Sequence, residues 1–321
     1  MNLRRAAVTG MVAVGGAGLG YLLQRSAAGR WRASAEELAA DGLSLPPDLR
    51  HHFVPTSDGG RVHVVERAAA GSADRPTYVL VHGIMLGVAT WAPQLRALDG
   101  RVLAVSQRGH GQSRAGSEGY SFDRLAADLL EVLDRLDVRD AVLVGHSMGG
   151  MVAQLCATTR AGDLAARVRR MVLVATSPGP VAAAPFASFA GALAARALSG
   201  AERRGRGPMP KSATVWGARM CFGAAPSPTR VALLRGMLDA MSPGALAQLL
   251  PHLFAFDVRD RLGEIAMEVH VVVGSRDLLT PPRTARAIAA RVRRARLTVL
   301  PGCGHMVMLE RPDALCDLVA E

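Results

Sequence analysis

Residues 145–149, Gly-His-Ser-Met-Gly, are the part of the chain best suited to covalent chemistry. Because the chain contains 34 glycines, this motif alone is weak evidence, and its surroundings must decide. An apolar run over 141–144 precedes it, and a helical pattern begins at Met148. A sharp strand-to-helix turn leaves no room for Cβ atoms beside the serine and lifts its hydroxyl clear of a sheet. This context predicts that Ser147 is a nucleophile.

A serine nucleophile needs a base, because a free hydroxyl reacts poorly at neutral pH. The chain has nine histidines, and His305 differs from the others by lying in a glycine-flanked loop between the last strand-like run and the last helical run. The sequence therefore predicts His305 as the general base. His82, His110 and His146 are expected to pack loops instead.

Strand and helix patterns alternate along most of the chain after residue 50. Short runs rich in Val and Leu predict strands over 61–66, 77–82, 101–106, 141–145, 171–175, 269–274 and 297–300. Most of these runs are continuously apolar, which is typical of strands covered on both faces. Helices are predicted over 90–98, 122–136, 148–159, 282–292 and 312–319. The alternation predicts the α/β class, with a doubly wound, mostly parallel sheet.

One interval, between the strands ending at 175 and beginning at 269, contains no strand pattern. Helical pieces are predicted there over 181–198, 212–222, 229–240 and 243–254. We expect this insertion to form a helical cap over the carboxyl edge of the sheet, where open α/β sheets bind ligands. The predicted division of the chain is an N-terminal segment and linker (1–50), a first core part (51–177), the cap (178–262) and a second core part (263–321).

Several motifs resemble those of the α/β-hydrolase superfamily, in the order that this family shows. The run 82–85, His-Gly-Ile-Met, follows a strand as the family's oxyanion loop does, and 108–113, Arg-Gly-His-Gly-Gln-Ser, resembles the loop after the next strand. Asp277 follows a strand where the family carries its acid, and 301–312 resembles the histidine loop and final helix. The order Ser, Asp, His is also the family's. The resemblance runs from residue 51 to the C-terminus, with the cap matching in position only.

This resemblance implies a catalytic triad of Ser147, Asp277 and His305. His305 would accept the serine proton, and Asp277 would fix the imidazole tautomer and stabilise the imidazolium. The backbone amides of Ile84 and Met148 would form the oxyanion hole, with Met85 as the alternative to Ile84.

The sequence departs from the family pattern at two positions outside the triad. Ser106 stands where the family often has Asp, and Glu268 lies near the point where a proline commonly precedes the acid strand. The serine at position 147 argues against the dehalogenase and epoxide-hydrolase branches, which carry Asp there.

The expected activity is that of a serine esterase or lipase-like enzyme, which cleaves a small-molecule carboxylic ester through an acyl-enzyme on Ser147 and requires no cofactor or metal. The predicted cap offers large apolar side chains, which either suit an apolar acyl group or pack the cap itself: Phe186, Phe189, Trp216, Met220 and Phe222. The same triad on this fold also serves acyl transfer, thioester or carbon–carbon bond hydrolysis, and perhydrolysis without a cofactor. A non-catalytic binding protein would usually have lost a triad member, and none is missing.

The formal net charge of +11 comes almost wholly from arginine, since Lys211 is the only lysine. The arginine clusters at 167–170 and 291–296 follow helical runs, where the helix dipole favours cations. Nucleic-acid binding needs cations gathered on one face with aromatics between them, so no nucleic-acid partner is predicted. None of the four cysteines forms a Cys-x-x-Cys motif with another, which argues against a disulfide framework. Cys303 and His305 alone are too few to bind a metal.

Residues 6–23 carry no charge and are flanked by arginines on both sides. Eighteen helical residues just span a hydrocarbon core of ~30 Å, although five glycines dilute the hydrophobicity here. The favoured interpretation is an uncleaved membrane anchor, hence membrane association of undetermined orientation. The alternatives are a signal peptide cleaved near Ala33-Ser34-Ala35 and a peripheral or soluble extension, which correspond to an exported or a cytoplasmic protein.

Overall fold

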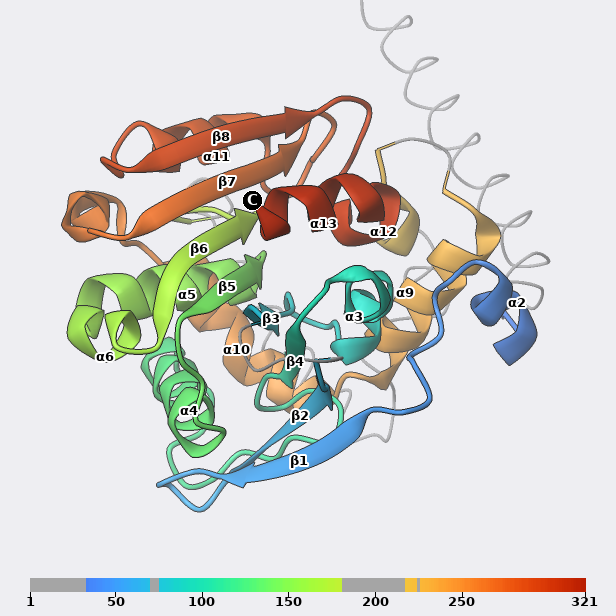
Figure 1. The fold of residues 1–321 in the computed structure, drawn as a ribbon, viewed down its shortest axis with the longest axis horizontal. Helices are drawn as coiled ribbons and strands as arrows, with labels where there is room; N and C mark the ends of the chain where they lie inside the picture. Colours follow the sequence, from blue (N-terminus) through green and yellow to red (C-terminus); the bar gives the residue numbers. More distant parts are fainter. Residues whose placement is uncertain (1–32, 70–74, 181–216, 224–225) are drawn as a thin grey trace, which may run out of the picture.

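The structure is a computed structural model that describes residues 33–69, 75–180, 217–223 and 226–321. The strands of its sheet are β1 (Arg50–Pro55), β2 (Arg61–Arg67), β3 (Thr77–Val81), β4 (Arg101–Ser106), β5 (Ala141–His146), β6 (Val168–Val174), β7 (Glu268–Gly274) and β8 (Ala295–Leu300). They lie side by side in the order β1-β2-β4-β3-β5-β6-β7-β8 (Figure 1). From β4 to β8 in this order every pairing is parallel, whereas β2 pairs antiparallel with both β1 and β4. The predicted α/β fold with a mostly parallel sheet is confirmed.

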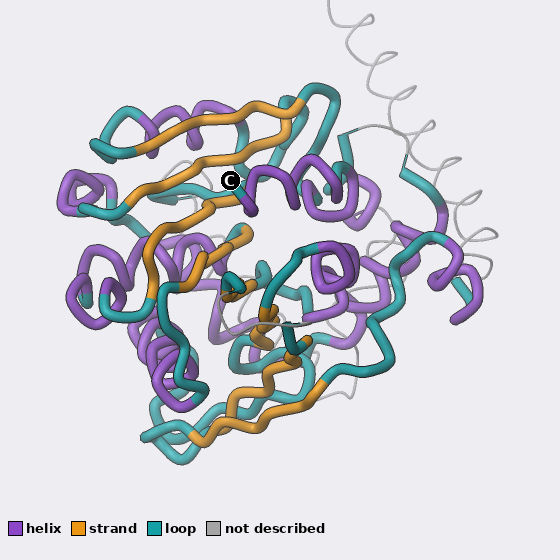
Figure 2. The backbone as a smooth tube through the Cα atoms, in the orientation of Figure 1, coloured by secondary structure: helices purple, strands orange, loops and turns teal. Residues whose placement is uncertain are grey.

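Helices cover both faces of this sheet (Figure 1, Figure 2). One hydrophobic cluster joins the strands to α4 (Phe122–Arg135), α5 (Met148–Thr159) and α11 (Pro282–Ala289). A second cluster, on the opposite face, joins them to α3 (Ala92–Ala97), α12 (Val307–Glu310) and α13 (Pro312–Ala320). The sheet is therefore doubly wound.

The buried strands account for the continuous apolar runs of the sequence. All six residues of β5 are buried, because Leu143 packs into the first cluster while Val142 and Val144 pack into the second. A strand with both sides covered has no position left for a polar, solvent-facing residue. Helix α4 instead shows an apolar stripe on one side, and it begins where the Ser121 hydroxyl accepts the backbone N–H of Arg124 at 3.1 Å.

The described part of the cap insertion contains α9 (Pro228–Ala240) and α10 (Pro243–Ala255), close to the helices predicted over 229–240 and 243–254. The helix predicted over 181–198 lies outside the described residues, and so do residues 212–216 of the helix predicted over 212–222. The two ends of the insertion meet, because the Val258 backbone N–H donates to the Pro178 carbonyl at 2.9 Å. The division of the chain at residues 178 and 262 stays a prediction.

The proposed anchor, residues 6–23, also lies outside the described part of the chain. Among the residues that the structure describes, none of the helices has the length and apolar character needed to cross a bilayer. Ser34 begins the short helix α2 (Ala35–Ala40), since its hydroxyl accepts the Glu37 N–H and the Glu37 carboxylate accepts the Ser34 N–H. Membrane attachment stays a prediction, to be tested by centrifuging lysates of cells that make the full chain.

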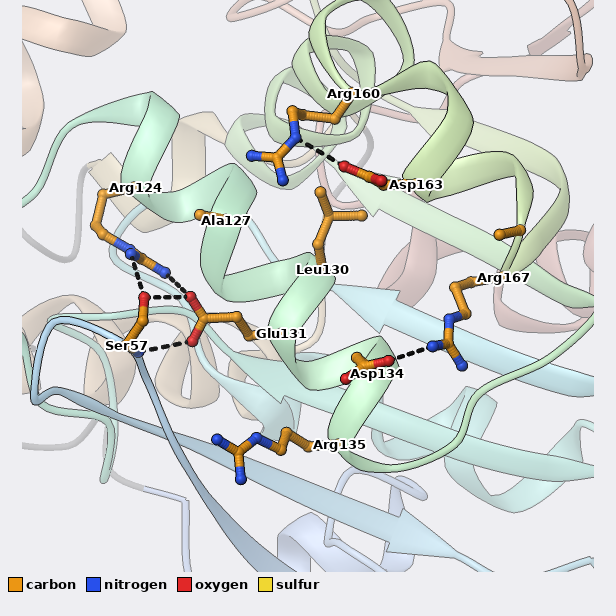
Figure 3. A pocket seen from close by; sticks show the side chains of 11 residues that line it. Ser57, Arg124, Ala127, Leu130, Glu131, Asp134, Arg135, Arg160, Asp163 and Arg167 are labelled. Atoms are coloured by element: carbon orange, nitrogen blue, oxygen red, sulfur yellow. Dashed lines mark hydrogen bonds and ion pairs between the residues drawn. The ribbon is translucent and has the colours of Figure 1, made fainter.

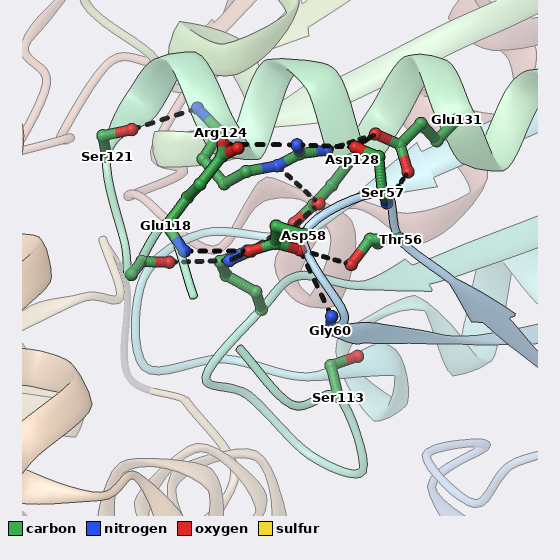
Figure 4. A network of polar contacts seen from close by, with 12 residues as sticks. Thr56, Ser57, Asp58, Gly60, Ser113, Glu118, Ser121, Arg124, Asp128 and Glu131 are labelled. Carbon is green, nitrogen blue, oxygen red and sulfur yellow. Dashed lines mark hydrogen bonds and ion pairs between the residues drawn. The ribbon is translucent and has the colours of Figure 1, made fainter. Parts of the chain in front are cut away.

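A network of polar contacts between the β1–β2 turn and α4 (Figure 4) ties the antiparallel edge of the sheet to the parallel part. Arg108, which follows β4, is fully buried between Asp58 of the β1–β2 turn and Asp128 of α4. Its guanidinium donates two hydrogen bonds to each carboxylate, at 2.6–3.1 Å, and one to the Gly119 carbonyl. Two bidentate contacts of this kind fix both the orientation of the guanidinium and its distance from each carboxylate.

Replacing Arg108 by methionine is expected to lower the free energy of unfolding by about 3–5 kcal/mol, because it leaves the buried Asp58 carboxylate without a cation and leaves Asp128 with Arg124 alone. Urea unfolding followed by circular dichroism measures this loss. The matched control is Arg139→Met, since Arg139 and its partner Asp137 are both exposed and such pairs contribute at most about 1 kcal/mol. Equal losses of unfolding free energy in the two variants would show that the buried network stabilises the fold no more than an exposed ion pair does.

Candidate active site

Ser147 occupies a strained turn between β5 and α5. Its φ of 51° and ψ of −118° lie in a region that residues with a side chain rarely adopt. The turn is held by its backbone, because the Ser147 N–H donates to the Val174 carbonyl at 3.0 Å. Gly149 permits the close approach behind it, since a Cβ there would lie 2.3 Å from the Val81 carbonyl oxygen. The backbone thus forms the sharp strand-to-helix turn that the motif predicted.

Asp277 and His305 meet at the carboxyl ends of β7 and β8. Their side chains are almost completely buried, and His305 Nδ1 lies 2.9 Å from Asp277 Oδ2. Burial alone would raise the pKa of Asp277, but the charge and hydrogen bond of His305, with hydrogen bonds from Thr280, outweigh it and lower the pKa. Asp277 is therefore ionised at neutral pH and orients the imidazole with its Nδ1 as donor.

Thr280 belongs to this arrangement, although sequence reasoning missed it. Its hydroxyl donates to Asp277 Oδ2 at 2.8 Å and lies 3.2 Å from His305 Nδ1. The backbone N–H groups of Leu279 and Thr280 both donate to Asp277 Oδ1 at 2.9 Å. The spacing Asp-x-x-Thr at a turn, in which an Asp side chain binds the backbone ahead of it, is the signal that could have identified Thr280.

The serine turn and the histidine loop are in direct contact through His146. Its ring lies 4.7 Å from the His305 ring, centroid to centroid, and its Nε2 donates to the His305 carbonyl at 3.0 Å. No hydrogen bond joins Ser147 to His305 in the described part of the chain. Catalytic hydrogen bonds are often long without substrate and shorten when it binds.

The two amides predicted to bind an oxyanion lie beside Ser147. The loop carrying Ile84 packs on the turn, since a Cβ on Gly83 would lie 3.0 Å from Ser147 Cβ. Within the described residues, the backbone N–H groups of Ile84 and Met148 have no hydrogen-bond acceptor. The Met85 N–H, in contrast, donates to His110 Nε2 at 3.0 Å. Of the two alternatives, the contacts favour Ile84 over Met85.

His82 and His110 hold this loop as neutral groups, in line with the expectation that they pack loops. His110 Nδ1 bonds the Arg108 carbonyl, which leaves its Nε2 as the acceptor for the Met85 N–H. Burial lowers the pKa of His82 to about 3 and that of His110 to about 4. The left-handed φ of 60° at Met85 is the kind of strained conformation that needs such outside support.

Lowering the pH from 7 to 5 is expected to reduce the free energy of unfolding. In this range His82 and His110 stay neutral in the folded chain but take up protons in the unfolded chain, whose histidines titrate near 6.5. Their contribution is complete above pH 6.5 and falls by about 1.4 kcal/mol per pH unit for each histidine below it, until the folded-state pKa is reached. Urea midpoints at pH 7, 6 and 5 measure the slope.

His110→Asn should make this slope shallower, because it removes one of the titrating groups. His252→Asn, at an exposed position of α10, should leave it unchanged and serves as the control. An unchanged slope in His110→Asn would contradict the assignment.

The cap residues named from the sequence divide between core and surface. Phe222 is buried in the second hydrophobic cluster, so it packs the fold, whereas Met220 is 40% exposed. Phe186, Phe189 and Trp216 lie outside the described residues. Among the described residues the four cysteines are all free, and no group of three or more metal-binding side chains occurs.

A pocket of about 670 Å³ lies away from the triad, between α4 and α6 (Ala161–Ala165) (Figure 3). Three of its four arginines pair with acids of the same pocket: Arg124 with Glu131, Arg160 with Asp163 and Arg167 with Asp134. None of the predicted site residues lines it. The candidate site is therefore the carboxyl edge of the sheet.

The chain is similar to known proteins in sequence and in fold. A model of the Alpha/beta hydrolase family matches residues 78–318. Epoxide hydrolase 4 of Mus musculus is 37% identical over 142 residues, which make up 43% of this chain and 39% of that protein. The 3-oxoadipate enol-lactonase 2 of Acinetobacter baylyi is 27% identical over 265 residues, or 82% of this chain and 94% of that protein. A solved structure of a hydrolase from Pseudomonas aeruginosa is 30% identical, with a TM-score of 0.71 over 85% of this chain and 97% of that one.

The chain spans less than half the length of the epoxide hydrolase, so that likeness concerns a part of that protein. The family match is broader, since it runs from β3 to α13 and includes the serine turn and the loops of Asp277 and His305. The chain therefore belongs to the Alpha/beta hydrolase family.

Proposed function

We propose that this chain is a serine hydrolase that cleaves a carboxylic ester through an acyl-enzyme on Ser147. The observation that carries the proposal is the buried Asp277–His305 pair, at 2.9 Å, next to a serine held in a strained turn with two unpaired amides beside it. A nucleophile, an oriented base and preorganised donors are the three parts that acyl transfer requires.

In the first half of the reaction, Ser147 Oγ attacks the ester carbonyl carbon while His305 Nε2 takes the hydroxyl proton. The carbonyl oxygen becomes an oxyanion, which the N–H groups of Ile84 and Met148 receive as hydrogen-bond donors. Asp277 stabilises the imidazolium that forms. The carbon–oxygen bond to the alcohol then breaks, and His305 returns its proton to the leaving alcohol.

In the second half, a water molecule replaces the alcohol. His305 takes a proton from the water as the water oxygen attacks the acyl carbon, and the same two amides receive the oxyanion. The bond between Ser147 Oγ and the acyl carbon breaks, and the serine regains its proton from His305. The products are one carboxylic acid and one alcohol, and no cofactor takes part.

An apolar acyl group is the substrate class that the surroundings support best. Leu278 and Leu279, directly after the acid, are 65% and 48% exposed, and Met220 is exposed on the segment that contacts the histidine loop. Exposed side chains of this size next to a site offer surface for burying hydrocarbon, at about 25 cal/mol per Å². The relative from Acinetobacter baylyi is named a lactonase, and a lactone is a cyclic ester.

Hydrolysis of p-nitrophenyl esters from acetate to palmitate tests the proposal. We expect turnover with an optimum beyond acetate, together with a mass increase on Ser147 after treatment with a fluorophosphonate. Absence of both turnover and labelling would overturn the proposal and favour a non-catalytic binding protein. Labelling without turnover of any ester would contradict ester hydrolysis and direct the search to thioesters, acyl acceptors or carbon–carbon bonds.

A further inference from the structure

A short segment of the cap insertion, residues 217–223, is bonded to both loops that carry the acid and the base. The Cys221 carbonyl accepts the backbone N–H of His305 at 2.8 Å and that of Met306 at 3.3 Å. The Arg276 side chain, next to the acid, donates to the Gly223 carbonyl at 3.3 Å. The position of the base is therefore set in part by the cap insertion.

The contact between this segment and the histidine loop is as close as two backbones allow. A Cβ on Gly223 would lie 2.5 Å from the Gly304 nitrogen, and a Cβ on Gly304 would lie 2.3 Å from the Gly223 nitrogen. Real Cβ atoms do not approach other atoms so closely, so both positions need glycine. Two N–H groups from different segments thus come together beside His305 without a backbone carbonyl to accept either.

Glu310 of α12 accepts both of these N–H groups. Its Oε1 accepts from Gly304 at 2.8 Å, and its Oε2 accepts from Gly223 at 3.0 Å. The side chain is 7% exposed, and no cation of the described residues forms a salt bridge with it. A buried carboxylate is costly unless it is hydrogen-bonded, and bonds to a charged acceptor are roughly twice as strong as neutral ones. These two bonds are its compensation.

We propose that Glu310 is a positioning residue for His305, one carboxylate that fastens the histidine loop to the cap segment. The inference rests on the proposed function, in which His305 is the base. Gly304 immediately precedes His305, so a shift of its backbone carries the imidazole away from Ser147 and Asp277. Glu310 touches neither substrate nor reacting atoms, and its effect passes through the loop.

The test is Glu310→Gln, which keeps the size of the side chain but replaces one acceptor oxygen by an NH₂ group that faces an N–H. We expect kcat for p-nitrophenyl butyrate to fall by about tenfold to a hundredfold, the range that small misplacements of catalytic groups produce, with KM within about twofold. Amide hydrogen exchange should become faster in peptides covering 217–223 and 302–306 together.

The matched control is Leu315→Ala, which removes a fully buried side chain of α13 and leaves the hydrogen-bond partners of Gly304 in place. It should lower thermal stability at least as much as Glu310→Gln while kcat stays unchanged. A kcat for Glu310→Gln equal to that of the unaltered chain, or a loss of kcat matched by Leu315→Ala, would overturn the proposal and leave Glu310 a purely structural residue.

The outcome for Glu310 remains separable from that for the proposed ester hydrolysis. If the unaltered chain cleaves no ester, the rate of fluorophosphonate labelling of Ser147 replaces kcat, because labelling needs the same base. Slower labelling in Glu310→Gln alone supports the positioning role, and equal labelling rates contradict it.

Discussion

Replacing Ser147 by alanine is expected to lower kcat for ester hydrolysis by about 10⁴-fold or more, to the level that bound water and the oxyanion amides alone can reach. The reason is that no acyl-enzyme can form without the hydroxyl, while the backbone turn that presents it is held by Gly149 and Val174 and should persist. Initial rates with p-nitrophenyl butyrate, alongside thermal unfolding, measure both effects.

The control for this variant is Ser121→Ala, which removes the hydroxyl that caps α4. It should cost about 1 kcal/mol of stability and leave kcat unchanged. Residual turnover in Ser147→Ala above about a hundredth of the unaltered rate would show that another group carries the reaction.

Asp277→Asn is expected to lower kcat by about 10⁴-fold with little change in KM. Asp277 Oδ1 accepts two backbone N–H groups, so the amide oxygen of asparagine will take that place and turn its NH₂ group towards His305 Nδ1. An NH₂ group is a donor, so Nδ1 must then be the acceptor and Nε2 carries the proton. In that tautomer His305 cannot accept the proton of Ser147.

Steady-state kinetics as a function of pH measure this effect. Asp257→Asn is the matched control, because this carboxylate at the base of the cap bonds the exposed Arg259 instead of a histidine. It should keep kcat within about twofold of the unaltered chain. If Asp277→Asn kept more than a tenth of the activity, another acid would have to orient His305.

The strand and the helix on either side of Ser147 were predicted closely from the sequence. Helix α5 has the bounds expected for it, and the strand ending before Ser147 differs from the expected range by one residue. Both are defined by local patterns: a continuous apolar run, a glycine-bounded turn and then a helical period. Such signals do not depend on what packs against the segment.

The first strand, β1 (Arg50–Pro55), was not predicted. Its sequence, Arg-His-His-Phe-Val-Pro, has charged and titratable side chains, and Val54 is the one fully buried residue among the six. The strand lies at the edge of the sheet and exists because its backbone pairs with β2. An edge strand with an exposed face carries little apolar pattern, so the sequence alone gives a weak signal.

Among the site residues, too, those with a local sequence signal were predicted and those that depend on tertiary contacts were not. Ser147 and His305 stand in distinctive local contexts, whereas Asp277 needed the family resemblance and the structure then joined it to His305. Thr280 and Glu310 were missed because their roles depend on contacts between distant segments. The Glu310 carboxylate meets an amide 87 residues earlier in the chain, and no periodicity in the sequence records such a meeting.

In the strained turn at position 147, the residues that fix the backbone differ from the residue that carries the reactive hydroxyl. The constraints on its backbone come from neighbours, above all the close contact of Gly149 with Val81, and none of them uses the serine side chain. A single substitution at position 147 can therefore replace the reactive atom and leave the backbone turn intact. A substitution at Gly149, in contrast, would disrupt the turn although the serine hydroxyl is still present. During evolution of this chain, substitutions at position 147 can change the reaction, whereas the neighbouring residues that fix the turn must be kept.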